Sequence, residues 1–146
     1  MRVGDWMTPE PVCVAPDTTI AEARTVMRRG GVRHLPVVDR GRLVGIISDR
    51  DVTLDAQTFL QMARDPVGEA GAAGEPVSTV MSRPVETVRE DESLEAVTHA
   101  LLRRRVGAIP VLDETDAVVG IVSATDLLDL LRIRQTLQVP ADSDAP

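Results

Sequence analysis

VGIISDRD occupies residues 44–51 of this 146-residue chain, and VGIVSATD occupies residues 119–126. In both stretches an apolar run containing Gly-Ile ends at a serine, and an aspartate follows three residues later. Three further blocks recur in the same order: Met7-Thr8 matches Met81-Ser82, 17–20 matches 91–94, and 32–39 matches 106–113. Agreement between four ordered blocks indicates that the chain is one pattern written twice.

Both halves predict the same order of elements, namely a short strand, a helix, a two-stranded hairpin and a second helix. In the first half, Thr19 and Glu22 form a capping-box pattern, and Gly30-Gly31 ends the predicted helix. Apolar runs at 35–38 and 43–47 flank a polar turn and predict the hairpin. The second hairpin is predicted within 109–122, and an apolar helical stripe follows it. These patterns predict an α/β fold, an α+β-like sandwich of two β-α-β-β-α units.

The repeat divides the chain into four segments. We expect the first unit at 1–56, a connecting helix and linker at 57–76, the second unit at 77–133 and a disordered tail at 134–146. The linker is rich in Gly and Ala, and the tail has little that it could bury. Each unit is too small to be stable as an independent domain, so we expect the two to pack face to face.

Charge and cysteine content disfavour several classes of function. With 16 Lys+Arg against 23 Asp+Glu, the net charge is −7, the wrong sign for a nucleic-acid partner. Cys13 is the only cysteine, which excludes an internal disulfide and fits a reducing cytoplasm. No apolar run approaches the ~20 residues that span a bilayer, so no membrane association is expected. His34 and His99 lack metal-ligand spacing, and no nucleophile, base and orienting group can be assembled. We therefore expect neither a metal site nor catalytic residues.

The Ser-x-x-Asp pattern has a binding interpretation and a structural one. Where a strand delivers the chain to the start of a helix, free backbone N–H groups attract phosphate. The aspartate carboxylate can accept hydrogen bonds from both hydroxyls of a ribose. The same pattern is also an ordinary helix-capping box, and one serine can serve both purposes.

In each half, the signature Gly-hydrophobic-hydrophobic-Ser-x-x-Asp follows a strand that has a proline near its start. This combination resembles the tandem CBS (cystathionine-β-synthase) domain pair, or Bateman module. The resemblance covers residues 3–132. It implies two lobes related by a pseudo-twofold axis, with clefts between them that bind AMP, ADP, ATP or S-adenosylmethionine as regulatory ligands. It further implies a homodimer, a possible regulated protein partner, and no required cofactor.

The resemblance also assigns roles to individual residues. Asp51 and Asp126 would hold ribose hydroxyls, and Ser48 and Ser123 would contact phosphate or ribose. Residues 12–14 and 85–87 would wall the clefts. The backbone of two segments would face adenine, and the residues taken from them as site residues are Val32, Arg33, His34, Pro36, Ala108 and Pro110.

The two predicted sites differ in charge. Arg33 and Arg50 belong to the first, whereas the second has Gly107 and Thr125 in their places. A guanidinium can bind phosphate with two charge-assisted hydrogen bonds, so the first site is predicted to be the better phosphate site. The second would take a weakly charged ligand or stay empty. A surface role for Arg50 is the alternative.

Two interpretations of function stay open at this point. The first is an adenosine-ligand sensor, and the second is a structural or dimerisation module whose clefts no longer bind nucleotides. The basic run Arg103-Arg104-Arg105 also has two interpretations. It either complements the dipole at the end of a helix or reaches a phosphate held by the other lobe.

Overall fold

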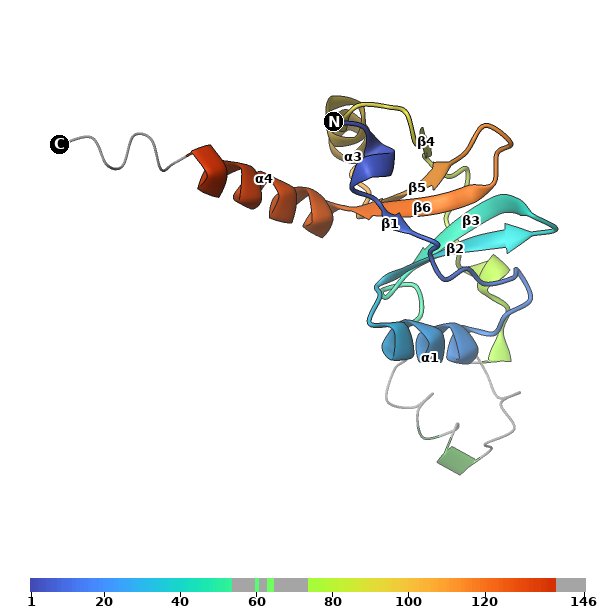
Figure 1. Ribbon diagram of the computed structural model, residues 1–146. Coiled ribbons are helices and arrows are strands. Elements are labelled where there is room, and N and C mark those ends of the chain that lie inside the picture. Colours follow the sequence, from blue (N-terminus) through green and yellow to red (C-terminus); the bar gives the residue numbers. More distant parts are fainter. Residues whose placement is uncertain (54–59, 61–62, 65–73, 139–146) are drawn as a thin grey trace.

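The computed structural model describes residues 1–53, 60, 63–64 and 74–138. It has the mixed α/β architecture predicted from the repeat, with two hairpins stacked between helix α3 on one side and helix α1 on the other (Figure 1). Its elements in chain order are η1 (Val3–Asp5), β1 (Thr8–Pro9), α1 (Ile20–Gly30), β2 (His34–Asp39), β3 (Arg42–Ser48), η3 (Val77–Thr79), β4 (Val88–Arg89), α3 (Leu94–Arg104), β5 (Ala108–Leu112), β6 (Val118–Ser123) and α4 (Ala124–Gln138).

Helices α1 and α3 begin and end at equivalent positions of the two repeats. Thr19 Oγ1 accepts a hydrogen bond from the Glu22 N–H at 3.1 Å, and Ser93 caps α3 in the same way. Helix α1 stops at Gly31, whose φ of 63° lies in the left-handed region that glycine adopts without strain. Helix α3 stops at Arg105, which takes the same left-handed conformation at φ 53° despite its side chain.

The sheets join the two repeats. Strands β2 and β3 form an antiparallel hairpin, and the second sheet has the order β1-β6-β5-β4. Strand β1 comes from the first repeat but pairs with β6 of the second, with Thr8 opposite Ile121. In the reciprocal position, Ser82 of the second repeat exchanges two backbone hydrogen bonds with Ile46 of β3, at 2.9 and 3.2 Å. Each repeat therefore begins on the edge of the other repeat's hairpin.

Two apolar clusters form the core, one under each hairpin. Leu35, Val37 and Ile47 centre the first and have no exposed surface. Ile109 and Val111 stand at the matching positions of the second and are equally buried. Side chains of this size contribute about 1.5–3 kcal/mol each when fully buried, so the alternating apolar pattern of the strands accounts for the position of the sheets.

Three local expectations need correction or lie outside the described residues. Helix α4 continues to Gln138, so residues 134–138 are helical rather than part of a disordered tail. The first signature does not start a helix at once, because residues 49–52 form a turn. In the segment expected as a strand at 12–14, only Val14 pairs, through one bridge to Val37. The predicted connecting helix falls largely outside the described residues, as does much of the linker.

Candidate functional site

The first Ser-x-x-Asp turn closes around a single carboxylate oxygen. Both the N–H and the hydroxyl of Ser48 donate to Asp51 Oδ2, at 2.8 and 3.2 Å, and the Asp51 N–H donates back to the Ser48 carbonyl at 3.0 Å. Both residues are half-buried. Within the described part of the chain, the second carboxylate oxygen, Oδ1, accepts no hydrogen bond. The turn thus fixes the carboxylate while leaving one oxygen to act as an acceptor.

The second turn is a reciprocal capping box. The Ser123 N–H donates to Asp126 Oδ2 at 3.0 Å, and the Asp126 N–H donates to Ser123 Oγ at 3.1 Å. Helix α4 begins at Ala124, immediately after the serine. The capping interpretation therefore holds for the second repeat, while Asp126 still keeps Oδ1 outside this box.

Short backbone contacts bring the predicted site residues of each repeat together. The Asp49 N–H donates to the Arg33 carbonyl at 2.8 Å, and the Ala124 N–H donates to the Gly107 carbonyl at 2.9 Å. The paired strands also place His34 opposite Ser48, as they place Ala108 opposite Ser123. The start of the first hairpin strand and the serine–aspartate turn therefore lie side by side in both repeats.

The predicted wall segments begin on the edge strand of the opposite repeat, which the sequence pattern did not indicate. Because Ser82 pairs antiparallel with Ile46, the chain from Ser82 to Val85 and Thr87 runs along β3 toward Val44, away from Ser48. Thr8 pairs antiparallel with Ile121 and the Glu10 N–H donates to the Val119 carbonyl, so the chain toward 12–14 likewise runs away from Ser123. Each repeat therefore enters beside the strand of the other repeat two residues before its serine, at Ile46 and at Ile121.

His34 crosses from the first repeat to the second. Its Nε2 lies 2.8 Å from the point where a Cβ on Gly107 would stand, so a larger residue at 107 would force the ring to shift. Burial lowers the pKa of His34 below its ordinary value of 6.5, although the charges of Asp49 and Asp51 act in the opposite direction. A neutral imidazole at this junction can donate one hydrogen bond and accept another.

Other predicted residues differ in how accessible they are. Pro36 and Pro110 are less than 2% exposed, and the Pro36 carbonyl accepts a hydrogen bond from Val14 at 3.0 Å. These prolines can act on a ligand only by positioning their strands. Val32 is 36% exposed, and Arg33 lines a cavity of about 500 Å³ together with Asp49 and residues of α1. Ala108 is 4% exposed, while Arg50 is exposed and lines no cavity described.

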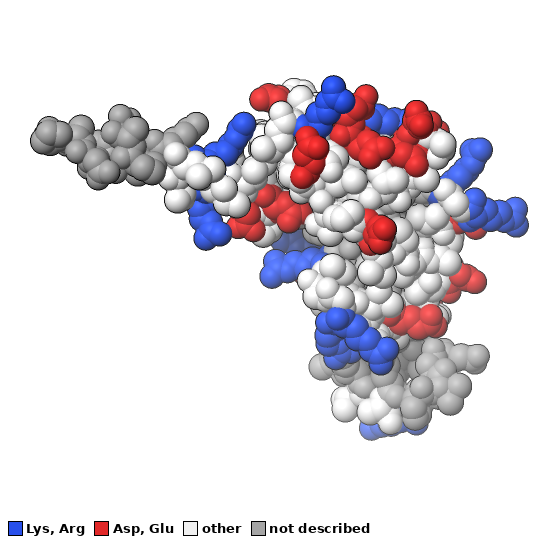
Figure 2. Space-filling view, in the orientation of Figure 1, with Lys and Arg blue, Asp and Glu red and all other residues white. Residues whose placement is uncertain are grey.

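The basic run at the end of α3 is largely engaged by one acid. Arg103 Nη2 contacts Glu86 Oε1 at 2.9 Å, and Arg104 Nε contacts Glu86 Oε2 at 3.1 Å. Glu86 lies between Val85 and Thr87, so these arginines hold the predicted wall segment against α3. On the face shown in Figure 2, basic side chains are scattered among acidic ones. Arg103 and Arg104 therefore tether residues 85–87 to the end of α3 through Glu86.

Two glycines of the repeated signature have a role that sequence reasoning missed. A Cβ on Gly45 would collide with the side chain of Met81, and a Cβ on Gly120 would collide with that of Met7. Both methionines belong to the segment by which one repeat joins the hairpin of the other. The available signal in the sequence was a methionine at the matching place in both repeats, Met7 and Met81.

Other features of the described residues bear on metal binding, membrane insertion and thiol reactivity. No group of three or more His, Cys, Asp or Glu side chains gathers there as metal ligands would. None of the helices found in those residues is long and apolar enough to cross a bilayer. The Cys13 sulfhydryl donates to the Pro11 carbonyl at 3.4 Å, and desolvation raises the pKa of this thiol, which lowers its thiolate fraction.

Comparison with known proteins gives consistent results. The family model for the CBS domain matches residues 3–54 and 77–133. The chain is 34% identical over 125 residues to the CBS domain-containing protein YhcV of Bacillus subtilis, covering 86% of this chain and 81% of that protein. Other curated relatives are longer, and the chain spans 45% of one and 22% of another.

Two solved structures of similar chains contain adenosine derivatives. The CBS domain pair of protein MJ0100, in complex with 5′-methylthioadenosine and S-adenosyl-L-methionine, is 27% identical with a TM-score of 0.74, and the match covers 92% of this chain and 98% of that one. CBSX2 of Arabidopsis thaliana, in complex with AMP, is 28% identical with a TM-score of 0.70. That match covers 91% of this chain and 98% of the other.

Proposed function

The chain belongs to the CBS domain family, and from that premise we propose that it is a regulatory module that binds an adenosine-containing ligand at the serine–aspartate turns. The ligand class is AMP, ADP, ATP or S-adenosylmethionine. AMP in CBSX2 and S-adenosylmethionine in the MJ0100 pair support this class. The module has no catalytic activity of its own and acts on a partner protein in the cytoplasm.

One observation carries the proposal: a carboxylate held by one oxygen in each repeat. Ser48 occupies Asp51 Oδ2, and Ser123 occupies Asp126 Oδ2, so Oδ1 of each aspartate can receive the hydroxyls of a ribose. A neutral side chain at these positions would lose charge-assisted hydrogen bonds, which contribute about 1.5–3 kcal/mol each.

The first turn suits phosphate better than the second. His34 and the backbone of Arg33 lie beside Asp51, whereas Ala108 and Gly107 stand at the matching places. Arg50 is exposed next to the same turn and can swing toward a phosphate. We therefore assign the more highly charged ligand to the turn of Ser48 and Asp51.

Regulation follows from the pairing of each repeat's leading segment with the strand that carries the other repeat's turn. Ligand at either turn contacts the hairpin of one repeat and the leading segment of the other, so it favours one relative position of the two. A ligand shifts such an equilibrium only by its difference in affinity for the two arrangements.

Helix α4 provides the surface for a homodimer. It projects from the body (Figure 1), and Leu128, Leu131, Ile133 and Leu137 are 66%, 44%, 51% and 75% exposed. Apolar side chains gathered on a protruding helix are stabilised when a second copy covers them. Dimer rearrangement would then transmit occupancy of the turns to the regulated partner.

The test is a thermal-shift and calorimetric titration with AMP, ADP, ATP and S-adenosylmethionine. At about 100 times Kd a ligand adds about 2.7 kcal/mol, which raises Tm by several degrees in a chain of this size. Asp51→Asn and Asp126→Asn should each weaken binding at their own turn by about tenfold or more. Asp129→Asn is the matched control, because Asp129 lies on the exposed side of α4 near Arg132.

A structural or dimerisation module is the second candidate, favoured by the capping box at Ser123. That box accounts for both residues of the second signature without any ligand. An absence of response to all four ligands, together with a stable dimer, would support this candidate and contradict the first.

A further inference from the structure

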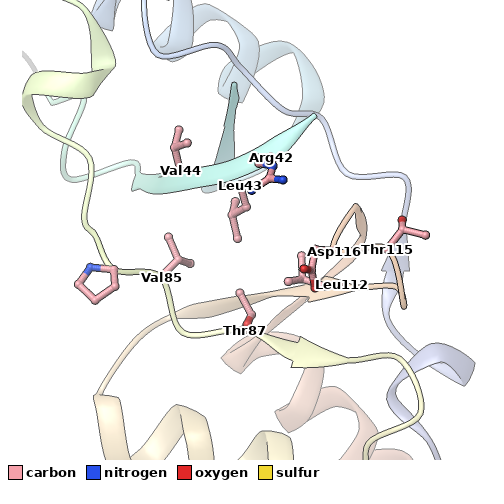
Figure 3. Close-up of a pocket in the computed structure, with 9 residues that line it drawn as sticks. Arg42, Leu43, Val44, Val85, Thr87, Leu112, Thr115 and Asp116 are labelled. Carbon is pink, nitrogen blue, oxygen red and sulfur yellow. The ribbon is translucent and has the colours of Figure 1, made fainter. Parts of the chain in front are cut away.

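A pocket of about 360 Å³ lies between the turn ends of the two hairpins (Figure 3). Leu43 and Val44 of β3 form one side, and Val85, Thr87 and Leu112 of the second repeat form the other. Figure 3 shows Leu43 pointing toward the side on which Val85 and Thr87 lie. The volume falls within the range of small-molecule sites, and the lining combines apolar side chains with Arg42, Thr87, Thr115 and Asp116.

The pocket is remote from the serine–aspartate turn of the same strand. Val44 precedes Ser48 by four residues, so at roughly 3.3 Å per strand residue the two are about 13 Å apart. Val85 and Thr87 belong to the predicted wall of the nucleotide cleft, but Arg42 stands at the opposite end of β3 from Ser48, and Leu112 stands at the opposite end of β5 from Ala108, which pairs with Ser123.

Two charged side chains line the pocket, and they are not equivalent. Asp116 is engaged by Arg89 Nη2 at 2.5 Å, and Arg89 Nη1 also donates to the Asp113 carbonyl at 2.5 Å. Arg42 has no ion pair within the described part of the chain. The hydroxyl of Thr115, another lining residue, donates to Asp113 Oδ1 at 2.6 Å. One positive charge without an ion-pair partner in the described residues therefore borders a pocket whose other charged group is already paired.

We propose that this pocket binds a small amphiphilic monoanion, a carboxylate carried on a short apolar body. The body lies between Leu43, Val85 and Leu112, where its burial removes apolar surface from water. The carboxylate pairs with Arg42, whose guanidinium can donate two parallel hydrogen bonds. Because the walls come from both repeats, such a ligand also favours one relative position of the repeats, and its binding is coupled to occupancy of the nucleotide cleft.

The probe is sodium hexanoate, titrated into the uniformly ¹⁵N-labelled full chain and followed by amide chemical shifts. We expect saturable shifts at Leu43, Thr87 and Thr115. Arg42→Gln should weaken hexanoate about tenfold or more, because the charge-assisted pair is lost. Arg40→Gln is the matched control, since Arg40 lies in the same turn, is exposed, and is not among the pocket residues. Neutral hexan-1-ol should bind the wild-type chain about tenfold more weakly or worse.

Two further variants separate this site from the nucleotide cleft. Val85→Trp should fill the pocket and abolish the hexanoate shifts, with far-UV circular dichroism verifying the fold. Asp51→Asn should leave hexanoate binding unchanged. The proposal is overturned if binding does not saturate, if Arg42→Gln binds like the wild type, or if hexanol binds as tightly as hexanoate. Strictly competitive displacement of hexanoate by AMP, as opposed to a limited change in the Kd of hexanoate, would assign the pocket to the nucleotide cleft and would also overturn the proposal.

Discussion

In the first repeat, Asp51 accepts two hydrogen bonds from Ser48 and the chain continues through a turn, whereas in the second repeat Ser123 and Asp126 bond reciprocally and start a helix. The residues between serine and aspartate explain the difference. In the first repeat the Asp49 carboxylate accepts the Arg50 N–H at 3.0 Å, a local bond that competes with helix formation. The second repeat has Ala124 there, the residue type that favours helix most.

The repeats also differ at the junction between them. His34 of the first repeat reaches Gly107 of the second, while Ala108, at the position equivalent to His34, has only a methyl group. The two repeats thus share the same order of elements but differ in the side chains at the junction between them. The comparison teaches that a matching signature predicts which residues lie together, and that its neighbours decide the geometry they adopt.

The largest loss of stability is expected from truncating equivalent core residues of the two repeats, and comparing the losses tests whether the repeats contribute equally to stability. Leu35→Ala and Ile109→Ala each remove a side chain with no exposed surface, so each should lower the free energy of unfolding by about 2–5 kcal/mol. Because the sheets exchange edges, urea denaturation should show one transition in both variants. Val12→Ala, at a side chain 49% exposed, should change stability by less than about 0.5 kcal/mol. Two separate transitions would contradict the expectation.

A smaller effect should distinguish the two serines. Ser123→Ala removes the N-cap of α4 and should cost about 1 kcal/mol, together with a loss of helical circular dichroism. Ser48→Ala removes one hydroxyl bond but leaves the backbone N–H to Asp51, so about 0.5 kcal/mol and no loss of helix are expected. Ser123→Asp should restore the cap. Equal loss of helix in the two alanine variants would show that the serines act alike.

Glu86 offers a still smaller difference between the repeats. It is clamped by Arg103 and Arg104, whereas Val12 occupies the equivalent place in the first repeat. Glu86→Gln should cost about 0.2–1 kcal/mol in low salt and less in high salt, because the pairs are near the surface and are screened. Denaturation at two ionic strengths measures this, and a cost independent of salt would exclude an ionic origin.

The smallest effect concerns pH and His34. Since burial lowers the pKa of His34 below 6.5, the unfolded chain takes up a proton first as pH falls. The stability due to neutral His34 is therefore present above pH 6.5 and declines as pH drops toward the folded pKa. Urea midpoints of wild type and His34→Gln at about pH 7.5 and about pH 5.5 should show a steeper acid loss in the wild type. Parallel curves would refute this role.

Much of the fold was predictable because its signals are local. Thr19 and Gly31 mark the ends of α1 as predicted, and the apolar alternation places both hairpins within one residue of their observed strands. The pairing of Thr8 with Ile121 was missed, since it joins residues far apart along the chain and its side-chain signal is limited to the adjacent contact of Met7 with Gly120. The extension of α4 through 134–138 was missed because Ile133 and Leu137 stay exposed among the described residues, so no packing pattern marks this part of the helix.

For the candidate site, the sequence indicated which residues gather but not from which repeat. Ser48, Asp51, Arg33 and His34 do lie together, as the hairpin register requires. The entry of the chain toward 85–87 along the other repeat's hairpin depends on Ser82 pairing with Ile46, whose side-chain signal is the adjacent contact of Met81 with Gly45. The role of Pro36 as a ligand contact, like the other assigned contacts, stays a prediction, and its burial limits it to positioning.

The exchange of edge strands limits how the gene for such a protein can be divided by recombination. A gene fragment that ends after β3 would encode a hairpin whose outer edge lacks its partner Ser82. A fragment that begins at η3 would lack Thr8, which pairs with β6. Unpaired edges of this kind invite aggregation. Recombination should therefore transfer the pair intact, and the two halves are free to diverge in chemistry only while remaining linked in one reading frame.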